Sequence, residues 1–403
     1  MRILKVTATY APFLEFGGPP IKVKALAEGL VRRGHRVTVL TSDWGLDSRV
    51  GPESIAIKTD RSPFGWRRDE AGVQAIYLPT WFRRRTVTWN PAVKRYCRAR
   101  LKDFDVVHIF GLYDLLGPAV SAACRARNIP YVVEPIGMFL PIVRNFAMKR
   151  VYHAMWGNSL LHGAAALIAT AEQERQEMIS GGLDPANIFL RRNGVEIPSE
   201  FPARGALRAK LRIPVNAKIV LFLGRLSPKK SPQLLLQAFA RIAERLGQSV
   251  QVVYVGPDEA GMRATLVRQA AESGVRDRIH FTGALFGEDK WAAYRDADVF
   301  VLPSQNENFG NTAAEAAAAG TPVIVTENCG VASVLGENAA LIVKHDAEEL
   351  ARALWRLLSD DALRADLAER GAQAARQLSW SEPVEEMEAL YEKLAASQRT
   401  KAQ

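Results

Sequence analysis

Short runs of β-branched and other apolar residues alternate with longer amphipathic segments along the whole chain. A short apolar run bounded by turn residues predicts a buried strand, whereas apolar positions three to four apart predict a helix. Alternation of the two is typical of parallel α/β architecture. In the first half the predicted strands cover residues 3–8, 36–41, 73–78, 106–110, 131–134, 167–170 and 188–191. The predicted helices there cover residues 21–33, 92–102, 115–127 and 171–181.

The second half repeats this pattern after a stretch without periodicity, residues 193–204, which contains Gly194, Pro198 and Pro202. Its predicted strands cover residues 218–224, 250–255, 279–283, 299–303, 322–326 and 340–343. Its predicted helices cover residues 231–246, 259–273, 312–319 and 346–358, and two further helical patterns follow residue 360.

A chain of 403 residues is too long for one typical hydrophobic core. We therefore expect an α/β protein of two doubly wound, Rossmann-like domains that face a central cleft. The expected boundaries are residues 1–195, residues 196–375, and a terminal helix over 376–403 that crosses back to the first domain. In such sheets ligands bind at the carboxyl ends of the strands, so the loops after strands are the places to look for chemistry.

Composition indicates an ordinary globular protein with 48% hydrophobic residues. Cys97, Cys124 and Cys329 form no C-x-x-C pair, which predicts buried thiols in a reducing compartment. No apolar stretch approaches the roughly 20 residues that span a bilayer. The first residues resemble a strand more than a signal peptide. We expect a cytoplasmic protein.

The net charge of +10 is concentrated in one segment. Residues 61–102 carry 11 basic and two acidic side chains, interleaved with seven aromatic residues, which excludes a uniformly basic nucleic-acid binder. This composition suits an anionic membrane interface at the inner face of the membrane, although single-stranded nucleic acid would use the same residue types. The alternative is a solvated surface loop followed by one basic helix.

A pair of glutamates follows the predicted strand at 299–303. Glu307 falls in the loop and Glu315 about one turn into the next helix, in an E-x₇-E pattern. Gly310, Asn311 and Thr312 occupy the start of that helix, where free amides favour a phosphate. A capped, alanine-rich core helix is the alternative. A buried carboxylate needs a hydrogen-bonding partner, and a ribose diol would satisfy Glu315.

This run, with Leu-Pro-Ser before it and Gly-Thr-Pro-Val-Ile after it, resembles the family-4 retaining glycosyltransferases (glycosyl transferases group 1), which have the two-domain type B fold. The resemblance implies that Glu315 holds the nucleotide ribose and that Glu307 lies beside the donor sugar. It also implies that the backbone of Phe309, Gly310, Asn311 and Thr312 cradles the distal phosphate and the sugar.

A second motif, Gly-Arg-Leu-Ser-Pro-Lys-Lys-Ser, ends the strand at 218–224. Arg225 and Lys230 could converge on a diphosphate leaving group and stabilise its charge. The alternative is a solvated pair at a turn. The family pattern has Gly where Ser231 stands here; because Ser can also begin a helix, we expect little consequence.

Three further segments resemble family motifs. Gly17 and Gly18 precede a helix and correspond to the loop that faces the sugar phosphate. Leu285 lies in the loop whose main chain reads the base. The loop beginning at Cys329 closes on the donor in relatives.

One departure concerns the loop after the strand at 131–134. Many relatives carry a His there that reaches the donor sugar, and Ile136 stands in its place. We expect Glu134 either to serve the acceptor side or to be a buried charge satisfied by the backbone. Asp296 and Asp298 look like a metal-binding D-x-D motif, but their place before a strand predicts a solvated pair. Glu172 and Glu174 predict the acidic first turn of a helix.

Together these features predict a retaining glycosyltransferase of the hexosyltransferase class that moves a sugar from a nucleotide diphosphate sugar to a hydroxyl acceptor. Glu307, Arg225 and Lys230 are the expected catalytic residues, and no metal or other cofactor is expected. The basic segment favours work at a membrane in cell-surface polysaccharide or glycolipid synthesis. A sugar epimerase or phosphorylase of the same fold, or a non-catalytic membrane- or polysaccharide-binding relative, are the alternatives.

Overall fold

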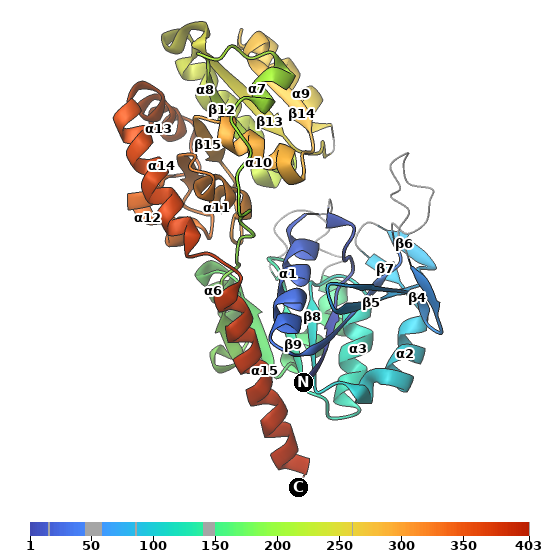
Figure 1. Cartoon of the computed structure of the whole chain (residues 1–403). Coiled ribbons are helices and arrows are strands. Elements are labelled where there is room, and N and C mark those ends of the chain that lie inside the picture. The colour runs from blue at the N-terminus through green and yellow to red at the C-terminus, as the bar shows by residue number, and fades with distance from the viewer. Residues whose placement is uncertain (15–16, 45–58, 85–86, 140–149, 260, 403) are drawn as a thin grey trace. The chain divides into compact units, whose positions relative to one another are not determined.

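The computed structural model describes residues 1–14, 17–44, 59–84, 87–139, 150–259 and 261–402. The chain divides into two compact units. The first comprises Met1–Gly194 and Trp380–Gln403, and the second comprises Val195–Ser379. Each is an α/β unit built on its own sheet (Figure 1).

The first unit contains a nine-stranded sheet in the order β11-β10-β9-β8-β1-β2-β5-β4-β3. The strands from β11 to β5 pair in parallel, and β4 and β3 pair antiparallel at one edge. Their bounds are β1 Arg2–Val6, β2 Arg36–Ser42, β3 Asp60–Ser62, β4 Gly65–Glu70, β5 Val73–Leu78, β8 Val106–Phe110, β9 Tyr131–Glu134, β10 Ala166–Ala169 and β11 Ile188–Leu190.

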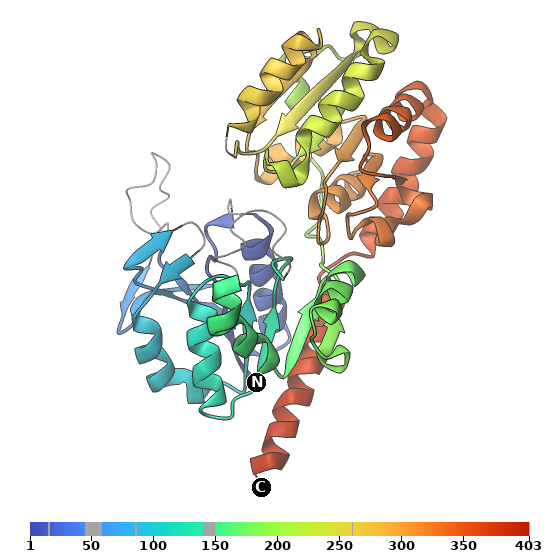
Figure 2. The same ribbon diagram turned by 180° about the vertical axis from the view of Figure 1, so that it is seen from behind.

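Helices cover both faces of this sheet, because alternate strand residues point to opposite sides. One face packs against α1 (Gly18–Arg32) and the terminal helix α15 (Ser381–Ala402). Figure 2 shows α15 beside the strands and helices of residues 150–190. The other face packs against α2 (Ala92–Arg100), α3 (Leu116–Arg125), α5 (Asn158–His162) and α6 (Glu172–Ser180).

The basic segment is more structured than a surface loop. It forms β3 and β4 at the sheet edge, a separate antiparallel hairpin of β6 (Phe82–Arg84) and β7 (Val87–Trp89), and helix α2. The alternative of a solvated surface loop is wrong for these residues, because alternating polar residues also suit strands near the edge of a sheet whose two faces are largely solvated. Arg85 lies outside the described residues.

The second unit contains a parallel six-stranded sheet in the order β14-β13-β12-β15-β16-β17. The strand bounds are β12 Lys218–Leu223, β13 Val250–Val255, β14 Ile279–Gly283, β15 Val299–Leu302, β16 Val323–Thr326 and β17 Leu341–Val343. Its runs of fully buried Val, Ile, Leu and Phe are typical of a parallel sheet covered on both faces. The strands predicted from the sequence are confirmed in both units.

Helices α7 (Ala206–Leu211), α10 (Gly287–Asp296), α11 (Asn311–Ala318) and α12 (Ala332–Ala339) pack on one face of this sheet. Helices α8 (Pro232–Leu246), α9 (Met262–Glu272) and α13 (Ala347–Ser359) pack on the other. Helix α14 (Asp361–Arg376) contributes to both cores. In the described part of the chain, none of the helices has the length and apolar character that crossing a bilayer requires.

Candidate active site

The candidate residues of the second unit lie in the loops at the carboxyl ends of β12, β14, β15 and β16, or in the first turns of α11, which follows the loop after β15. Because β12, β15 and β16 are neighbours in a parallel sheet, their carboxyl ends lie at the same edge. The loop after β15 and the loop after β16 are joined by hydrogen bonds in both directions. The Glu307 amide donates to Asn328 at 3.0 Å, and the Gly330 amide donates to Glu307 at 2.9 Å.

Glu307 and Lys230 form an ion pair across this edge. Each side chain is 18% exposed, so the pair remains accessible from solvent while protein surrounds most of it. Lys230 ends the short 3₁₀ turn Pro228–Lys230 after β12, and Glu307 comes from the loop after β15. The structure thus brings together two residues that are 77 positions apart in the chain.

The start of α11 presents backbone amides to the same edge. Gly310 is its N-cap and has φ 98°, a left-handed conformation that favours glycine. A Cβ atom at this position would lie 3.1 Å from side-chain atoms of both Leu302 and Val331. Phe309 is buried beneath the turn, and Asn311 and Thr312 form the first helical positions. This arrangement can accept an anion.

Glu315, one turn into α11, is held by two side chains of α10. Lys290 Nζ lies 2.9 Å from one carboxylate oxygen, and the Tyr294 hydroxyl donates to the other at 2.8 Å. Burial and the neighbouring Glu315 raise the pKa of Tyr294 far above its ordinary value, so the hydroxyl keeps its proton. The protein itself therefore supplies two partners for the Glu315 carboxylate. A carboxylate can accept about four hydrogen bonds, which leaves capacity for a ligand.

Lys290 and Tyr294 were not predicted as site residues from the sequence. Their spacing of four residues on one helix was the available signal, because positions i and i+4 lie on the same face. It was masked by the continuous run Trp291–Tyr294, which shows no helical period.

Arg225 and Leu285 also occupy the loops of this edge. Arg225 follows β12, is 61% exposed, and lies 3.5 Å from Glu259. The structure thus pairs Arg225 with Glu259 and pairs Lys230 with Glu307. Leu285 follows β14, and its side chain is buried in the core. Its main chain remains the part that a ligand could contact.

Ser231 shows why the family has glycine at this position. Its φ of 49° and ψ of 48° are left-handed, and it immediately precedes α8. Ser231 is the N-cap residue of α8, as expected, although in the described part of the chain its side chain makes no capping hydrogen bond to an amide of that helix. Its hydroxyl instead lies 2.9 Å from His345 Nε2 and donates to the Pro228 carbonyl at 3.2 Å.

In the first unit, Gly17 follows the loop after β1, and Gly18 is the first residue of α1. Gly17 has φ 101° and is the N-cap, and among the described residues no atom would lie within 4 Å of a Cβ at either glycine. Glycines at a helix start allow the backbone to approach a ligand closely.

Glu134 at the end of β9 is fully buried. The second of the two alternatives expected a buried charge with backbone partners, but the partners of Glu134 are side chains. Lys22 lies 2.5 Å away, and Arg191 donates to both carboxylate oxygens at 2.9 Å. Ile136, two residues later, has φ 56°, which is unusual for a β-branched residue. Glu174, expected only as an acidic helix start, accepts from the Gly137 amide at 2.6 Å and from Thr170.

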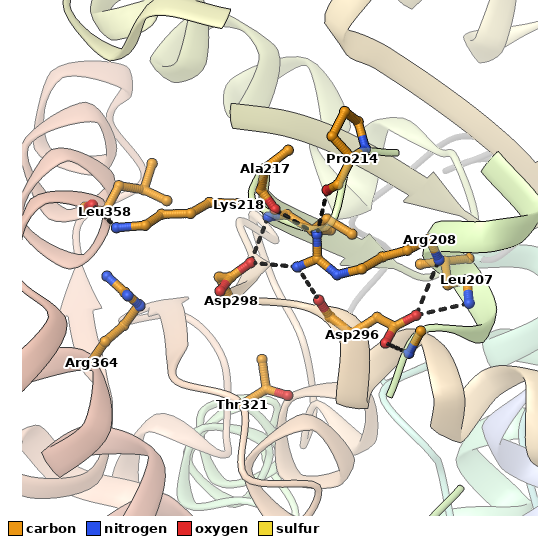
Figure 3. Close-up of polar contacts among 12 residues, drawn as sticks. Leu207, Arg208, Pro214, Ala217, Lys218, Asp296, Asp298, Thr321, Leu358 and Arg364 are labelled. Atoms are coloured by element: carbon orange, nitrogen blue, oxygen red, sulfur yellow. Dashed lines mark hydrogen bonds and ion pairs between the residues drawn. The ribbon is translucent and has the colours of Figure 1, made fainter. Parts of the chain in front are cut away.

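Asp296 and Asp298 are not the solvated pair that the sequence predicted. Asp296 is 2% exposed and accepts hydrogen bonds from the amides of Gly205, Leu207 and Arg208 at the start of α7. Asp298 binds the Arg208 guanidinium at 3.0 Å (Figure 3). Both carboxylates thus anchor a segment about 90 residues earlier in the chain. Over the residues that the structure describes, no group of His, Cys, Asp and Glu could hold a metal ion.

Two family models match this chain in succession. The glycosyl transferase 4-like domain matches residues 17–194, and the glycosyl transferases group 1 model matches residues 203–374. A D-inositol 3-phosphate glycosyltransferase of Mycolicibacterium smegmatis is 30% identical, over 96% of this chain and 88% of that protein. The chain belongs to the group 1 glycosyl transferases. A second such relative, from Xylanimonas cellulosilytica, is 35% identical over 72% of each chain.

Solved structures agree on the fold of this glycosyltransferase. HepE of Anabaena, crystallised with UDP and glucose, superposes with a TM-score of 0.77 at 18% identity, over 98% of this chain and 100% of that one. Sucrose-phosphate synthase of Thermosynechococcus elongatus superposes with a TM-score of 0.75 at 22% identity, over 98% and 99%. The glycosyltransferase has the type B fold of two Rossmann-like units.

Proposed function

We propose that this glycosyltransferase transfers a hexose from a nucleotide diphosphate sugar to a hydroxyl acceptor with retention at the anomeric carbon. The observation that carries the proposal is the cluster at the carboxyl edge of the second sheet. There the Lys230–Glu307 pair, the amides at Gly310 and the carboxylate of Glu315 follow neighbouring strands. The crystallised complex of HepE with UDP and glucose supports UDP-glucose as the first donor to test.

Each group of the cluster then has a role. Glu315, oriented by Lys290 and Tyr294, accepts hydrogen bonds from the ribose hydroxyls. Lys230 and Arg225 stabilise the charge that develops on the diphosphate, and the amides at the start of α11 bind its distal phosphate. Glu307 positions the sugar. The bond from the acceptor oxygen to the anomeric carbon forms on the face from which the phosphate departs, and the acceptor proton passes to the departing phosphate oxygen.

A donor panel tests this proposal. We expect one nucleotide diphosphate to raise the thermal unfolding temperature of the wild type, because a ligand stabilises the state that binds it. Glu315→Ala should abolish that shift, whereas Glu288→Ala, which removes an exposed carboxylate of α10, should leave it unchanged. Equal shifts in both variants would overturn the role of Glu315. Product formation that requires a hydroxyl acceptor separates a transferase from an epimerase or a phosphorylase.

We further propose that the enzyme acts on a lipid-linked acceptor at an anionic membrane surface, in glycolipid or cell-surface polysaccharide synthesis. The support is the basic segment, whose hairpin carries exposed Trp81, Phe82 and Trp89. The name of the relatives gives inositol 3-phosphate as the competing acceptor. Binding to anionic liposomes should fall when Arg83, Arg84 and Arg85 become Ser. Unchanged liposome binding, with turnover of inositol 3-phosphate, would favour the competing acceptor.

A further inference from the structure

A groove of about 540 Å³ lies at the β3–β4 edge of the first unit. It lies between the β3–β4 hairpin, the segment that joins β5 to β6, and the start of α2, elements that Figure 1 shows near one another. Its volume falls within the range of small-molecule sites. Its lining carries three aromatic rings, three proline rings and two arginines, and none of the described lining residues is a carboxylate.

The two arginines of the groove lie over aromatic rings. The guanidinium of Arg61 is 5.1 Å from the centroid of Trp66, and that of Arg95 is 5.6 Å from the centroid of Phe64. One nitrogen of Arg95 donates to the Pro63 carbonyl. Stacking and this bond hold both cations in place without neutralising them.

Other arginines of the same segment do have acidic partners. Arg67 pairs with Asp69, Arg68 with Glu70 at 3.0 Å, and Arg100 with Asp103 at 2.5 Å. Among the described residues, no carboxylate lies within ion-pair distance of Arg61 or Arg95. The groove therefore combines two cations that have no acidic partner in the described part of the chain with a largely apolar wall, which points to an anionic ligand that also has an apolar part.

Trp81 extends the groove onto an exposed aromatic surface. Its side chain lines the groove and is 73% exposed, and its ring lies edge-on to Trp89, with centroids 5.8 Å apart. Trp89 and Phe82, on the β6–β7 hairpin, are 48% and 55% exposed. Tryptophans beside cations suit the interface of a bilayer, from which a hydrocarbon chain could enter the groove.

The lining suits a lipid better than an acidic saccharide. A sugar ring presents several hydroxyls that each need a partner, whereas the polar side-chain groups of the lining are the Ser62 hydroxyl, two guanidiniums and the indole N–H groups of Trp66 and Trp81, nearly all of them donors. We propose that the groove binds one lipid phosphate, with the phosphate on Arg61 and Arg95 and the hydrocarbon on Trp66 and Trp81. This site would hold the lipid end of the acceptor, and it rests on the proposed transfer to a lipid-linked acceptor.

Farnesyl phosphate is the probe that tests the groove. We expect it to bind the wild type, measured by calorimetry, and to bind Arg61→Ala/Arg95→Ala at least about tenfold more weakly, because a charge-assisted pair contributes more than about 1.4 kcal/mol. Farnesol and inorganic phosphate each lack one half of the ligand and should bind more weakly than farnesyl phosphate. Arg98→Ala removes an exposed cation of α2 that does not line the groove, and should leave affinity unchanged.

Two further measurements guard against misfolding and against failure of the proposed function. Arg61→Glu alone reverses an exposed charge, and in the described residues the Arg61 guanidinium makes no hydrogen bond to the backbone. The affinity of this variant for farnesyl phosphate should also fall. Nucleotide binding should stay unchanged in both groove variants. The proposal that the groove binds a lipid phosphate would be overturned if both variants bound farnesyl phosphate as tightly as the wild type. It would also be overturned if the wild type bound a uronic-acid disaccharide more tightly than the lipid. If the wild type bound no nucleotide but still bound farnesyl phosphate, the proposed function would be overturned and the groove would not.

Discussion

The ammonium group of Lys22 and the carboxylate of Glu134 lie 2.5 Å apart in the interior of the first unit, where their side chains are 3% and 0% exposed. Lys22 belongs to α1 and Glu134 ends β9. Arg191, also buried, donates to both carboxylate oxygens. The pair fixes the first turns of α1 on the sheet, and α1 begins at the Gly17–Gly18 turn. The interior of the sheet thereby positions a loop of the candidate site.

Replacing Glu134 by Gln should strongly destabilise the first unit. Burial alone would raise the pKa of Glu134, but Arg191 and Lys22 outweigh it and hold the pKa below its ordinary value. Without the carboxylate, two buried cations lose their counter-charge, which costs about 3–5 kcal/mol. Urea unfolding should show this loss. Glu70→Gln, which breaks an exposed pair with Arg68, should cost under about 1 kcal/mol. Equal midpoints for the two variants would contradict the prediction.

Lys5 should make stability depend on pH. Burial, reinforced by Arg191, lowers its pKa to about 7, and its Nζ lies 3.4 Å from the Tyr391 hydroxyl. Above pH 7 Lys5 is neutral in the folded chain but still protonated in the unfolded chain, so unfolding takes up a proton. Its contribution to stability therefore rises with pH from about 7 towards its unfolded value, by up to about 1.4 kcal/mol per pH unit.

Comparison with Lys5→Met isolates this contribution. The free energy of unfolding of the wild type should increase relative to that of the variant between pH 7 and 9 and should be parallel to it below pH 6. Parallel profiles over the whole range would show that Lys5 titrates normally.

The strands could be predicted from the sequence because a buried parallel sheet needs continuous apolar runs, such as Val250–Val255. Strand β4 (Gly65–Glu70) could not, since a strand next to the sheet edge whose faces are largely solvated has the composition of a loop. Among the candidate site residues, Glu307 and Glu315 followed from their place after a predicted strand.

The partners of the site residues were harder to predict than the residues themselves. Lys290 and Tyr294 lie on α10, and that helix contacts α11 only in the folded unit. Likewise the role of Asp296 depends on amides of Gly205 and Leu207, which packing brings to it from about 90 residues away. Local pattern gives no information on such pairs, because they depend on how helices are arranged on the sheet.

Asp296 should prove to be structural, with no metal involved. Asp296→Ala removes the acceptor for three amides at the start of α7, and should lower the free energy of unfolding by roughly 2–3 kcal/mol. Asp277→Ala, at an exposed position, should have little effect. A chelator should change neither the stability nor the activity of the wild type. Loss of activity in chelator that a divalent ion restores would contradict this reading.

Tyr294→Phe should weaken donor binding without stopping turnover. The change removes one hydrogen bond to Glu315, while Lys290 still holds the other carboxylate oxygen. If Glu315 binds the ribose as proposed, that contact is the same in the ground state and the transition state, so KM for the donor should rise about three- to tenfold, with kcat within about twofold. Steady-state kinetics with varied donor measure both. A fall in kcat at unchanged KM would place Tyr294 in the chemical step instead.

Gly310→Ala should separate the geometry of the α11 start from general stability. At φ 98° an alanine is strained, and its Cβ would lie 3.1 Å from Leu302 and Val331, so the turn must shift. We expect a loss of roughly 1–3 kcal/mol in unfolding free energy and at least a tenfold fall in kcat, because the shifted amides would not reach the phosphate that we propose they bind.

Gly320→Ala provides the matched control. Gly320 has φ 77° at the other end of the same helix, and the nearest atom to its Cβ is 3.8 Å away. It should lose similar stability and keep its kcat. If the two variants lost kcat equally, the start of α11 would have no special role in binding the phosphate.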